Sequence, residues 1–485
     1  MRTLFVSSEA YPLIKTGGLA DVSGSLPAAL RALGADVRLL VPGYPAVLQK
    51  LLEPHHIAMI EDLPVIGSAE LIMGEMPGTK VPVMAIVAPS LYERTGGPYV
   101  DETGLDWADN PLRFGILSKI AAILSTAQSP LIEQWLPDIV HCNDWQSGLT
   151  PAFMHYMGAQ RAKSVLGIHN LAFQGCFSAE WIGMLGLPPE CFQINGVEYH
   201  GQLSFLKAGI YYSDSITTVS PTYAHEIQTE AFGFGLQGLL RTRGHEIRGI
   251  LNGIETQEWD PANDPHIAVH YDAKHLAGKK AVKAALQSQL GLYADPAAPL
   301  LGVVSRLTYQ KGLDSFLSIA EPLLHKGCQI ALLGGGEATL EQGFRELGQQ
   351  YPLQVSTNIG YNEALSHQIM AGTDIFIMPS RFEPCGLNQM YGLRYGTPPV
   401  VTRTGGLADS VIDTNEATLK AGSANGFVID QADPQQLLAT IQRAIGYLQD
   451  EKTWRRIQRN GMQLDLGWTH SARDYMSLYQ ELVDG

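Results

Sequence analysis

Two short segments of this chain combine cations with residues that could hold a phosphate. Lys15 stands just before Gly17-Gly18 at the start of a helical pattern. Glycines let a ligand approach the backbone, and the free N–H groups of a helix start favour an anion. Arg306 and Lys311 follow a predicted strand on one loop and could clamp a diphosphate. For each segment a tight turn or a solvated loop with surface cations is the alternative interpretation.

Polar side chains also follow three other predicted strands. Glu383 precedes a proline, which favours a loop, and a carboxylate there can bind sugar hydroxyls or stabilise developing positive charge. His169 follows a strand at 164–168, and Asp144 follows one that begins at 139. These groups are expected on the binding side of their sheets, because ligands of open α/β sheets bind beyond the carboxyl ends of the strands.

Several common sites are disfavoured by the spacing of their residues. Neither glycine segment matches a Walker A loop or G-x-G-x-x-G, which argues against a nicotinamide dinucleotide. The spacing of His141, Cys142 and Asp144 fits no zinc pattern. The triplet Gly334–Gly336 is more simply a turn than a phosphate cradle, and Cys385 is favoured as a contact or core residue over a nucleophile.

The composition limits the possible function classes. The chain has 485 residues, 45% of them hydrophobic and 17% charged, with a formal net charge of −15. This is a globular composition with room for two or three domains. The acidic balance disfavours nucleic acid or an anionic membrane as partner, but it allows a small anionic substrate held by local cations.

Cysteine usage and hydropathy favour an intracellular protein. The five cysteines are widely spaced and include no C-x-x-C, so neither a disulfide framework nor a zinc site is indicated. No run of 18 apolar residues occurs, and the first residues lack the apolar region of a signal peptide. We therefore expect a cytoplasmic protein without a transmembrane helix.

The elements that must position these residues follow a βαβ rhythm. Short apolar runs of strand length alternate with stretches of helical spacing, which predicts doubly wound parallel sheets. The predicted strands are Thr3–Val6, Val37–Val41, Val81–Val87, Ile139–His141 and Ser164–Ile168 in a first series, and Leu300–Val304, Gln329–Leu333, Asp374–Pro379 and Pro399–Thr402 in a second.

The two series predict two similar α/β domains. The hexapeptide TGGLAD occurs at 16–21 and again at 404–409, each time after a basic residue and before a helical pattern. The polar stretch 252–265 is predicted to be a hinge or linker. The expected division is 1–250, 251–460 and a C-terminal helix at 461–485 that could pack on either half. The default ligand site is then the cleft between the two domains.

Five segments, KTGGLAD, GIHN, SRLTYQKG, SRFEPCGL and RTGGLADSV, occur in this order along the chain. Together they resemble the bacterial glycogen synthase and plant starch synthase family, and the resemblance runs nearly from end to end. It implies the GT-B fold, two Rossmann-like doubly wound domains facing an interdomain cleft. It also implies transfer of glucose from ADP-glucose to the non-reducing end of an α-1,4-glucan, with retention at the anomeric carbon and with neither metal nor cofactor.

The resemblance also assigns roles to matching residues. Lys15 and Gly18 would lie at the donor phosphates, Arg306 and Lys311 would neutralise the ADP leaving group, and Glu383 and His169 would contact the donor sugar. The remaining positions would line the site. Tyr361 would pack on the adenine side, Cys385, Gly386 and Leu387 would line the sugar and phosphate, and Asp21, Tyr99, Asp144 and Asn252 would line the cleft.

Three positions depart from the pattern of such enzymes. Tyr391 stands eight residues after Glu383, where the wider class often has a second glutamate. Asn143 and Asn388 stand where many relatives carry His and Thr. We expect front-face attack, in which the acceptor hydroxyl gives its proton to the leaving phosphate. The alternatives are a UDP-glucose-dependent or phosphorylase-type enzyme of the same fold, or a non-catalytic protein that binds glucan or a nucleotide.

Overall fold

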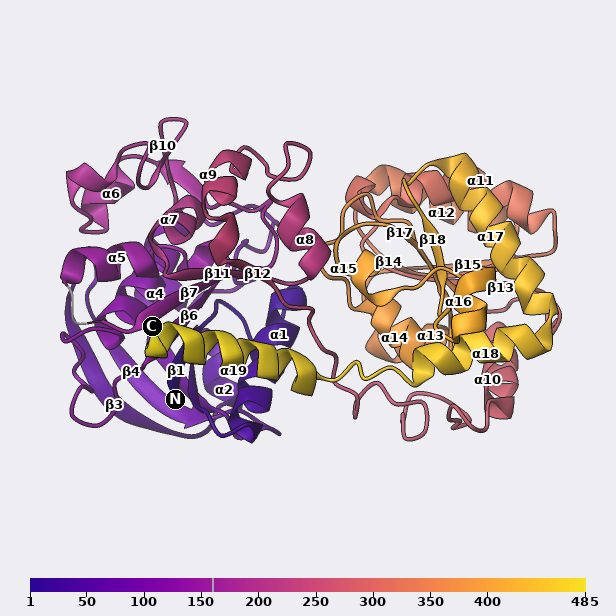
Figure 1. Cartoon of the computed structure of the whole chain (residues 1–485), viewed down its shortest axis with the longest axis horizontal. Coiled ribbons are helices and arrows are strands. Elements are labelled where there is room, and N and C mark those ends of the chain that lie inside the picture. The colour runs from indigo at the N-terminus through magenta and orange to yellow at the C-terminus, as the bar shows by residue number, and fades with distance from the viewer. Residues whose placement is uncertain (159–160) are drawn as a thin grey trace. The chain divides into compact units, whose positions relative to one another are not determined.

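The computed structural model describes residues 1–158 and 161–485, and these form two compact units. Unit 1 contains Met1–Gly253 together with Trp468–Gly485, and unit 2 contains Ile254–Gly467 (Figure 1). The division therefore lies a few residues beyond the bounds of 250 and 460 that the sequence suggested.

Unit 1 is built on a nine-stranded sheet with β1 at its centre. Seven neighbouring strands are parallel, five of them at predicted positions, and their hydrophobic residues are buried because helices lie on the sheet. In sheet order the strands are β12 (Ile247–Gly249), β11 (Ser215–Thr218), β7 (Lys163–Ile168), β6 (Ile139–Asn143), β1 (Arg2–Val6), β2 (Asp36–Pro42), β5 (Pro82–Val87), β4 (Gly67–Glu75) and β3 (Leu52–Leu63).

The β3–β4 pair was not predicted from the sequence. It forms an antiparallel hairpin that adds two strands to one edge of the parallel sheet. A second, three-stranded antiparallel sheet also belongs to unit 1, in the order β8 (Cys176–Ser178), β10 (Gln202–Ser204) and β9 (Glu198–Tyr199). Exposed positions along β3 weaken its apolar run, so hydrophobic patterning alone gave little signal for it.

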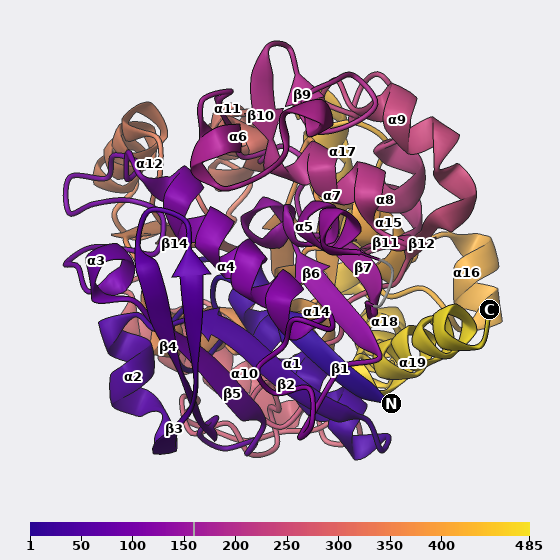
Figure 2. The ribbon, with the colours of Figure 1, turned by 90° about the vertical axis from the view of Figure 1, so that its left-hand side faces the viewer.

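The helices of unit 1 surround the large sheet, as Figure 2 shows from the side of this unit. They are α1 (Gly18–Ala32), α2 (Pro45–Lys50), α3 (Pro89–Tyr92), α4 (Asn110–Leu124), α5 (Thr150–Met157), α6 (Trp181–Met184), α7 (Phe205–Tyr212), α8 (Pro221–Glu226), α9 (Gln237–Thr242) and α19 (Trp468–Asp484).

The C-terminal helix α19 is part of unit 1 and packs beside α1 (Figure 2). Its buried face includes Trp468, Ala472, Tyr475 and Tyr479. The hydroxyl of Tyr479 lies 2.6 Å from Nδ1 of His141 on β6. The last helix of the chain is thus fastened to the strand beside the one that begins it.

Unit 2 is a six-stranded, wholly parallel sheet covered by helices on both faces. Leu301, Val303, Ile330 and Leu332 pack with α11 (Leu313–Leu324), α12 (Ala338–Gln350) and α17 (Pro434–Gln449). The alternate residues of the same strands pack with α10 (Ala277–Gln289) and α13 (Glu363–Gly372). This period-2 alternation between two cores is what a doubly wound sheet requires.

The strands of unit 2, in sheet order, are β15 (Val355–Ile359), β14 (Gln329–Gly334), β13 (Leu300–Val304), β16 (Ile375–Met378), β17 (Pro399–Thr402) and β18 (Phe427–Ile429). Its helices are α10 (Ala277–Gln289), α11 (Leu313–Leu324), α12 (Ala338–Gln350), α13 (Glu363–Gly372), α14 (Asn388–Arg394), α15 (Gly405–Ser410), α16 (Glu416–Ala421), α17 (Pro434–Gln449) and α18 (Glu451–Met462). The prediction of parallel α/β sheets in both halves is confirmed.

The stretch 252–265, predicted as a hinge or linker, is for most of its length a packed part of unit 2. The Trp259 ring stacks between His367 and Tyr391, with centroids 3.8 and 3.7 Å away. Asp264 is buried and bonds to His367 and Tyr395. Polar composition suggested a solvated linker, but here the polar groups find buried partners. The hinge interpretation was therefore wrong beyond residue 253.

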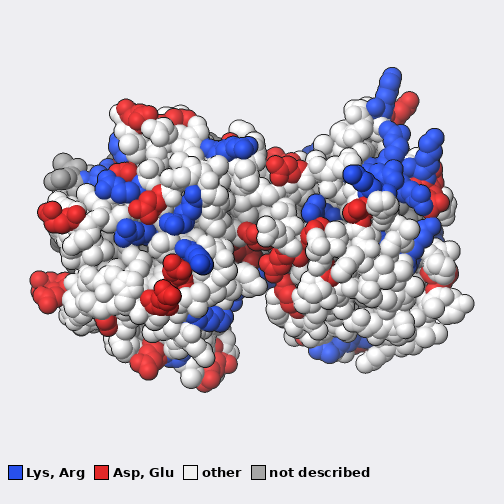
Figure 3. Space-filling model, turned by 90° about the horizontal axis from the view of Figure 1, so that it is seen from below, with Lys and Arg blue, Asp and Glu red and all other residues white. Residues whose placement is uncertain are grey.

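Charged side chains of both signs are interspersed over the face of unit 1 seen at the left of Figure 3. No helix of the described residues is long and apolar enough to cross a membrane.

Candidate active site

The glycine loop before α1 is organised by a buried carboxylate. Glu9, 3% exposed, accepts hydrogen bonds from the backbone N–H groups of Thr16 and Gly17 and, at 2.9 Å, from the Tyr99 hydroxyl. Burial raises the pKa of Glu9, and these hydrogen bonds oppose the shift. A Cβ built on Gly17 or Gly18 would meet nothing within 4 Å. The loop is therefore held from beneath and has open space above its glycines.

The Lys15 ammonium lies 2.7 Å from Asp21 Oδ1 and 5.4 Å from the centre of the Tyr11 ring. In the ligand-free protein this cation is thus partly neutralised by a carboxylate of α1. An anionic ligand at the loop would have to compete with Asp21 for the ammonium.

The neighbouring parallel strands β6 and β7 bring Asp144 and His169 together, because their carboxyl ends lie side by side. Asp144 Oδ1 accepts hydrogen bonds from the backbone N–H groups of His169, at 2.7 Å, and Asn170, at 3.3 Å. Burial raises the pKa of Asp144 to about 7. The residue also has a φ of +54°, a conformation that is costly for a side chain other than glycine.

The His169 ring contacts Asn143 at the end of β6, with Nε2 2.8 Å from Oδ1. Burial lowers the pKa of His169 to about 4, so the imidazole is neutral at neutral pH. The predicted residues Lys15, Gly18, Asp21 and Tyr99 thus gather around one loop, and Asp144 and His169 around two strand ends. Asn252 is buried near the end of unit 1, and its Oδ1 has no hydrogen-bond partner among the described residues.

In unit 2 the predicted residues Lys311 and Glu383 form an ion pair of 2.5 Å. Their side chains are only 14% and 8% exposed, and Ser380 Oγ donates a further hydrogen bond of 3.0 Å to Glu383 Oε2. Gly312, at φ +67°, makes this approach possible, since a Cβ there would collide with the Pro379 carbonyl. The structure therefore joins a cation and a carboxylate that are 72 residues apart in sequence.

The loops that carry this pair are fastened to each other by Arg381. Its guanidinium forms an ion pair of 2.6 Å with Asp314 at the start of α11 and lies 3.6 Å from the centre of the Tyr309 ring. The backbone N–H of Arg381 also donates to the Gln310 carbonyl. Arg306, on the same loop as Lys311, is exposed.

The second TGGLAD segment differs from the first in what its glycines face. A Cβ on Gly405 would collide with the Glu383 carbonyl, and one on Gly406 with the Cys385 carbonyl. The Gly406 N–H donates to the Glu383 carbonyl at 3.2 Å. These glycines therefore support the Glu383–Cys385 loop from below, whereas Gly17 and Gly18 leave a surface open.

The other predicted residues of unit 2 lie around the same loop or at its margin. Cys385 is buried, and Gly386 has the positive φ of +68° that favours glycine. Leu387 precedes α14, which begins at Asn388. Tyr361 is 78% exposed, and its hydroxyl bonds to Glu363. An aromatic ring this open can stack on a planar ligand.

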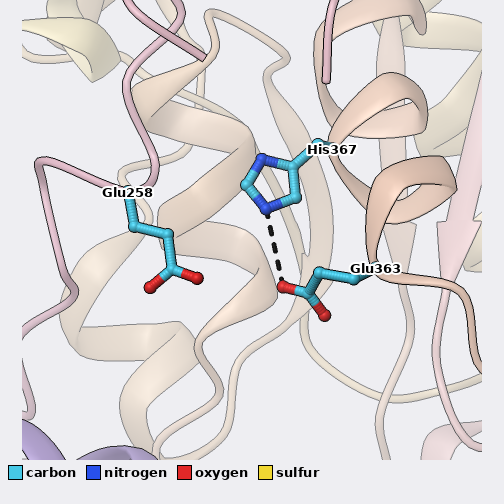
Figure 4. A group of neighbouring side chains, drawn as sticks. All are labelled: Glu258, Glu363 and His367. Atoms are coloured by element: carbon cyan, nitrogen blue, oxygen red, sulfur yellow. Dashed lines mark ion pairs between the residues drawn. The ribbon is translucent and has the colours of Figure 1, made fainter. Parts of the chain in front are cut away.

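Glu258, Glu363 and His367 have ligand atoms within 4.8 Å of one another and are the one group in the described residues spaced to hold a metal ion (Figure 4). Burial works to lower the pKa of His367, but hydrogen bonds to Asp264 and Glu363 raise it to about 9. At neutral pH the ring is then a cation without a free lone pair, and it balances the carboxylates itself. Because both ring nitrogens of His367 already form ion pairs, of 2.9 Å with Asp264 and 3.5 Å with Glu363, the geometry fits an ion-pair cluster better than a metal site.

Sequence reasoning missed Glu9 and Ser380, which hold the two candidate loops. Both are polar residues within three positions of the end of a strand, the same signal that selected His169 and Asp144. Their roles depend on which loop lies above them, and that is visible only in the folded chain.

Family models match both halves of the chain. A model described as the starch synthase catalytic domain matches residues 2–242, and one described as glycosyl transferases group 1 matches residues 292–463. The chain is 52% identical to a glycogen synthase of Nitrosomonas eutropha over 100% of this chain and 96% of that relative. It is also 52% identical to a glycogen synthase of Dechloromonas aromatica over 99% and 98%.

The structure resembles that of the catalytic domain of starch synthase IV from Arabidopsis thaliana bound to ADP and acarbose. The TM-score is 0.87 at 33% sequence identity, covering 100% of this chain and 99% of that one. A sucrose-phosphate synthase from Thermosynechococcus elongatus shares the fold, with a TM-score of 0.59 at 17% identity.

Proposed function

The chain belongs to the bacterial glycogen synthase and plant starch synthase family, and from this premise we propose that it transfers glucose from ADP-glucose to the non-reducing end of an α-1,4-glucan, with retention at the anomeric carbon. The substrates of this reaction are ADP-glucose and the glucan, the reaction takes place in the cytoplasm, and it needs no metal or other cofactor.

The observation that carries this proposal is the Lys311–Glu383 pair. A buried carboxylate and a partly buried cation 2.5 Å apart offer the two groups that a nucleotide-sugar donor needs at its reacting bond. The ammonium suits the diphosphate, and the carboxylate suits the sugar hydroxyls and the positive charge that develops at the anomeric carbon. In the free protein each group neutralises the other, which makes their burial tolerable before the donor arrives.

Departure of ADP is the main demand of the reaction, because a diphosphate leaves easily only when its charge is neutralised. Lys311 and the exposed Arg306 would supply cations from unit 2, and Lys15 with the open backbone of Gly17-Gly18 would supply them from unit 1. These are preorganised groups aimed at developing charge, the largest single source of catalysis in many enzymes.

The sugar side of the site would consist of Glu383 and the neutral imidazole of His169. We favour front-face attack, in which the acceptor hydroxyl gives its proton to the leaving phosphate while its oxygen bonds to the anomeric carbon. Tyr361 would stack on adenine with its exposed ring, and Asp144, Tyr99 and Asn252 would contact donor or acceptor.

The direct test offers radiolabelled ADP-glucose and UDP-glucose separately to the full-length protein with glycogen as acceptor. Incorporation into polymer from ADP-glucose, at a kcat/KM well above that for UDP-glucose, is the expected result. Digestion of the product with a glucosidase specific for terminal α-1,4 bonds should release the label.

Other outcomes identify the alternatives. A preference for UDP-glucose makes the protein a different transferase of this fold, and activity only with glucose 1-phosphate makes it a phosphorylase-type enzyme. Binding of glucan without turnover of any donor identifies a non-catalytic protein. Trapping of a covalent glucosyl adduct on a side chain would overturn front-face attack while leaving the overall reaction in place.

A further inference from the structure

Asn143 lies at the end of β6, fully buried, and its side-chain amide makes three hydrogen bonds. Its Nδ2 lies 2.9 Å from the Val6 carbonyl and 3.3 Å from the His141 carbonyl, and its Oδ1 lies 2.8 Å from His169 Nε2. Backbone carbonyls only accept hydrogen bonds, so the amide nitrogen must face them. Turning the amide by 180° would set its oxygen against two carbonyl oxygens. The amide orientation is therefore determined by the backbone around it.

This orientation determines where His169 carries its proton. The Asn143 oxygen can only accept, so the hydrogen bond of 2.8 Å must be donated by Nε2–H of the imidazole. We propose that Asn143 is a positioning residue that keeps the His169 proton on Nε2 and leaves Nδ1 as a hydrogen-bond acceptor. The consequence for catalysis rests on the proposed function, whereas the tautomer itself does not.

Three further observations support a single, fixed tautomer. Burial lowers the pKa of His169 to about 4, so a second proton on Nδ1 is absent at neutral pH. Among the described residues the His169 ring has its hydrogen bond at Nε2 and none at Nδ1. Gly167 adjoins the network, since a Cβ there would lie 2.9 Å from His141 Nε2 and a tight 3.2 Å from Asn143 Oδ1, and its absence leaves room for the amide.

The second nitrogen of His169 then constrains the substrate. A sugar hydroxyl can donate or accept, but towards a bare Nδ1 it must donate its proton. A donor analogue with fluorine at that hydroxyl has no proton to give and loses the contact. Asn143 thus makes His169 select for a hydroxyl that can donate a hydrogen bond. The same ring in the other tautomer would bind the fluorinated analogue far better.

The first experiment measures the tautomer without any assay of activity. Long-range ¹H–¹⁵N spectra of protein labelled at histidine report which ring nitrogen carries the proton, and His169→Gln assigns the signal. From pH 6 to 8 the wild type should show protonated Nε2 and bare Nδ1. A protonated Nδ1, or a mixture of tautomers, overturns the proposal even if the protein is an active glucosyltransferase.

The second experiment separates positioning from mere structural support. Asn143→Ala should mix the tautomers and lower kcat/KM for ADP-glucose about tenfold, the effect of one misplaced hydrogen bond. In a His169→Ala background the same change should cost less than about twofold, because the residue it acts through is gone. Equal losses in both backgrounds would assign Asn143 a structural role and refute the proposal.

Ser147→Ala is the matched control. Ser147 is also fully buried and donates its hydroxyl to the Asn143 backbone carbonyl at 2.9 Å, but it does not touch His169. We expect this variant to keep the wild-type tautomer and kcat/KM.

A third experiment uses ADP-glucose analogues that carry fluorine at C2, C3, C4 or C6, one at a time. With the wild-type protein, fluorine at one of these positions should lower kcat/KM, and Asn143→Ala should make that decrease smaller. If no position behaves in this way, the claim that His169 Nδ1 accepts a hydrogen bond from a sugar hydroxyl is wrong. The spectra then still test the tautomer by themselves.

Discussion

At the scale of single residues, each candidate site keeps its cation next to a carboxylate. Lys15 pairs with Asp21 in unit 1, and Lys311 pairs with Glu383 in unit 2. An ammonium held this way is oriented before the substrate arrives, and its lysine stem is less free to move. A ligand that binds to either ammonium would have to compete with the paired carboxylate, and a ligand with more negative charge than one carboxylate would do so best.

Replacing Lys311 or Glu383 by alanine should lower kcat by about 100-fold or more, because one lost charge contact in a closed site is worth about 3 kcal/mol. Initial rates with ADP-glucose and glycogen measure the effect, and thermal unfolding shows whether the fold survives. Lys280→Ala is the control, since it breaks the exposed pair with Glu451 in the same unit. Near-wild-type turnover of either site variant contradicts the assignment.

Asp144 should make the stability of unit 1 depend on pH. Its pKa of about 7 lies above the ordinary value near 4, so the native state keeps a proton that the unfolded state loses first. Stability contributed by this group is therefore present below pH 4 and is lost as pH rises to 7, by at most about 4 kcal/mol. Hydrogen exchange of β6 and β7 peptides at pH 5 to 8 should show this fall in the wild type but not in Asp144→Asn. Parallel slopes for the two proteins would be evidence against the raised pKa.

At the scale of elements, the last helix and residues 255–265 each connect parts of one unit that are far apart in the sequence. Helix α19 returns to unit 1 and connects to β6 through Tyr479 and His141. Residues 255–265 pack on α13 and α14 of unit 2 through Trp259 and Asp264. Since β6 ends at Asn143, α19 also supports the strand that orients His169.

Tyr479→Ala should destabilise unit 1 by about 3–5 kcal/mol, because it removes a fully buried aromatic ring and a hydrogen bond to His141. Peptides from β6 and α1 should lose protection from hydrogen exchange, while peptides from β13 to β17 should not. Tyr293→Ala, at an exposed tyrosine of unit 2, is the control. Unchanged exchange in β6 would show that α19 does not support this strand.

Removal of divalent metals should leave the enzyme intact. The imidazolium of His367 already balances Glu258 and Glu363, so dialysis against EDTA should change neither kcat nor melting temperature. Glu258→Gln should likewise keep its activity. A loss of activity that is restored by added zinc or manganese would instead identify the cluster as a metal site.

At the scale of the whole molecule, the chain has the GT-B class of fold, and each unit has candidate site residues of its own on loops that follow its parallel strands. The units differ in continuity. Unit 2 is one uninterrupted stretch, whereas unit 1 needs the C-terminal helix to complete it. This difference predicts how the protein can be divided.

Residues 254–467 expressed alone should fold and bind ADP, because both of their hydrophobic cores and the Lys311–Glu383 pair lie within this stretch. ADP at 100 times its dissociation constant should stabilise the fragment by about 2.7 kcal/mol. Calorimetry and thermal unfolding measure this, with the Lys311→Ala fragment as control. A fragment that unfolds cooperatively yet gains nothing from ADP would remove unit 2 from the donor site.

Much of the fold was predictable from the sequence, because buried parallel strands are continuous apolar runs and their spacing does not depend on distant contacts. The sequence also predicted that Lys15, Arg306, Lys311, His169 and Glu383 lie on loops that follow strands, whereas their roles at a site stay predictions. Five segments that occur in a fixed order along the chain also indicated the family that the comparisons show.

Tertiary structure alone decided what these residues contact. The identical glycines at 17–18 and 405–406 have different roles, because one pair faces open space and the other supports the loop of Glu383. Glu9 holds the glycine loop because it accepts hydrogen bonds from the Thr16 and Gly17 N–H groups. Asn143 can orient His169 because two backbone carbonyls fix its own amide. Sequence determines residue types and local conformation, whereas proton positions and ion pairs depend on distances between segments far apart in the chain.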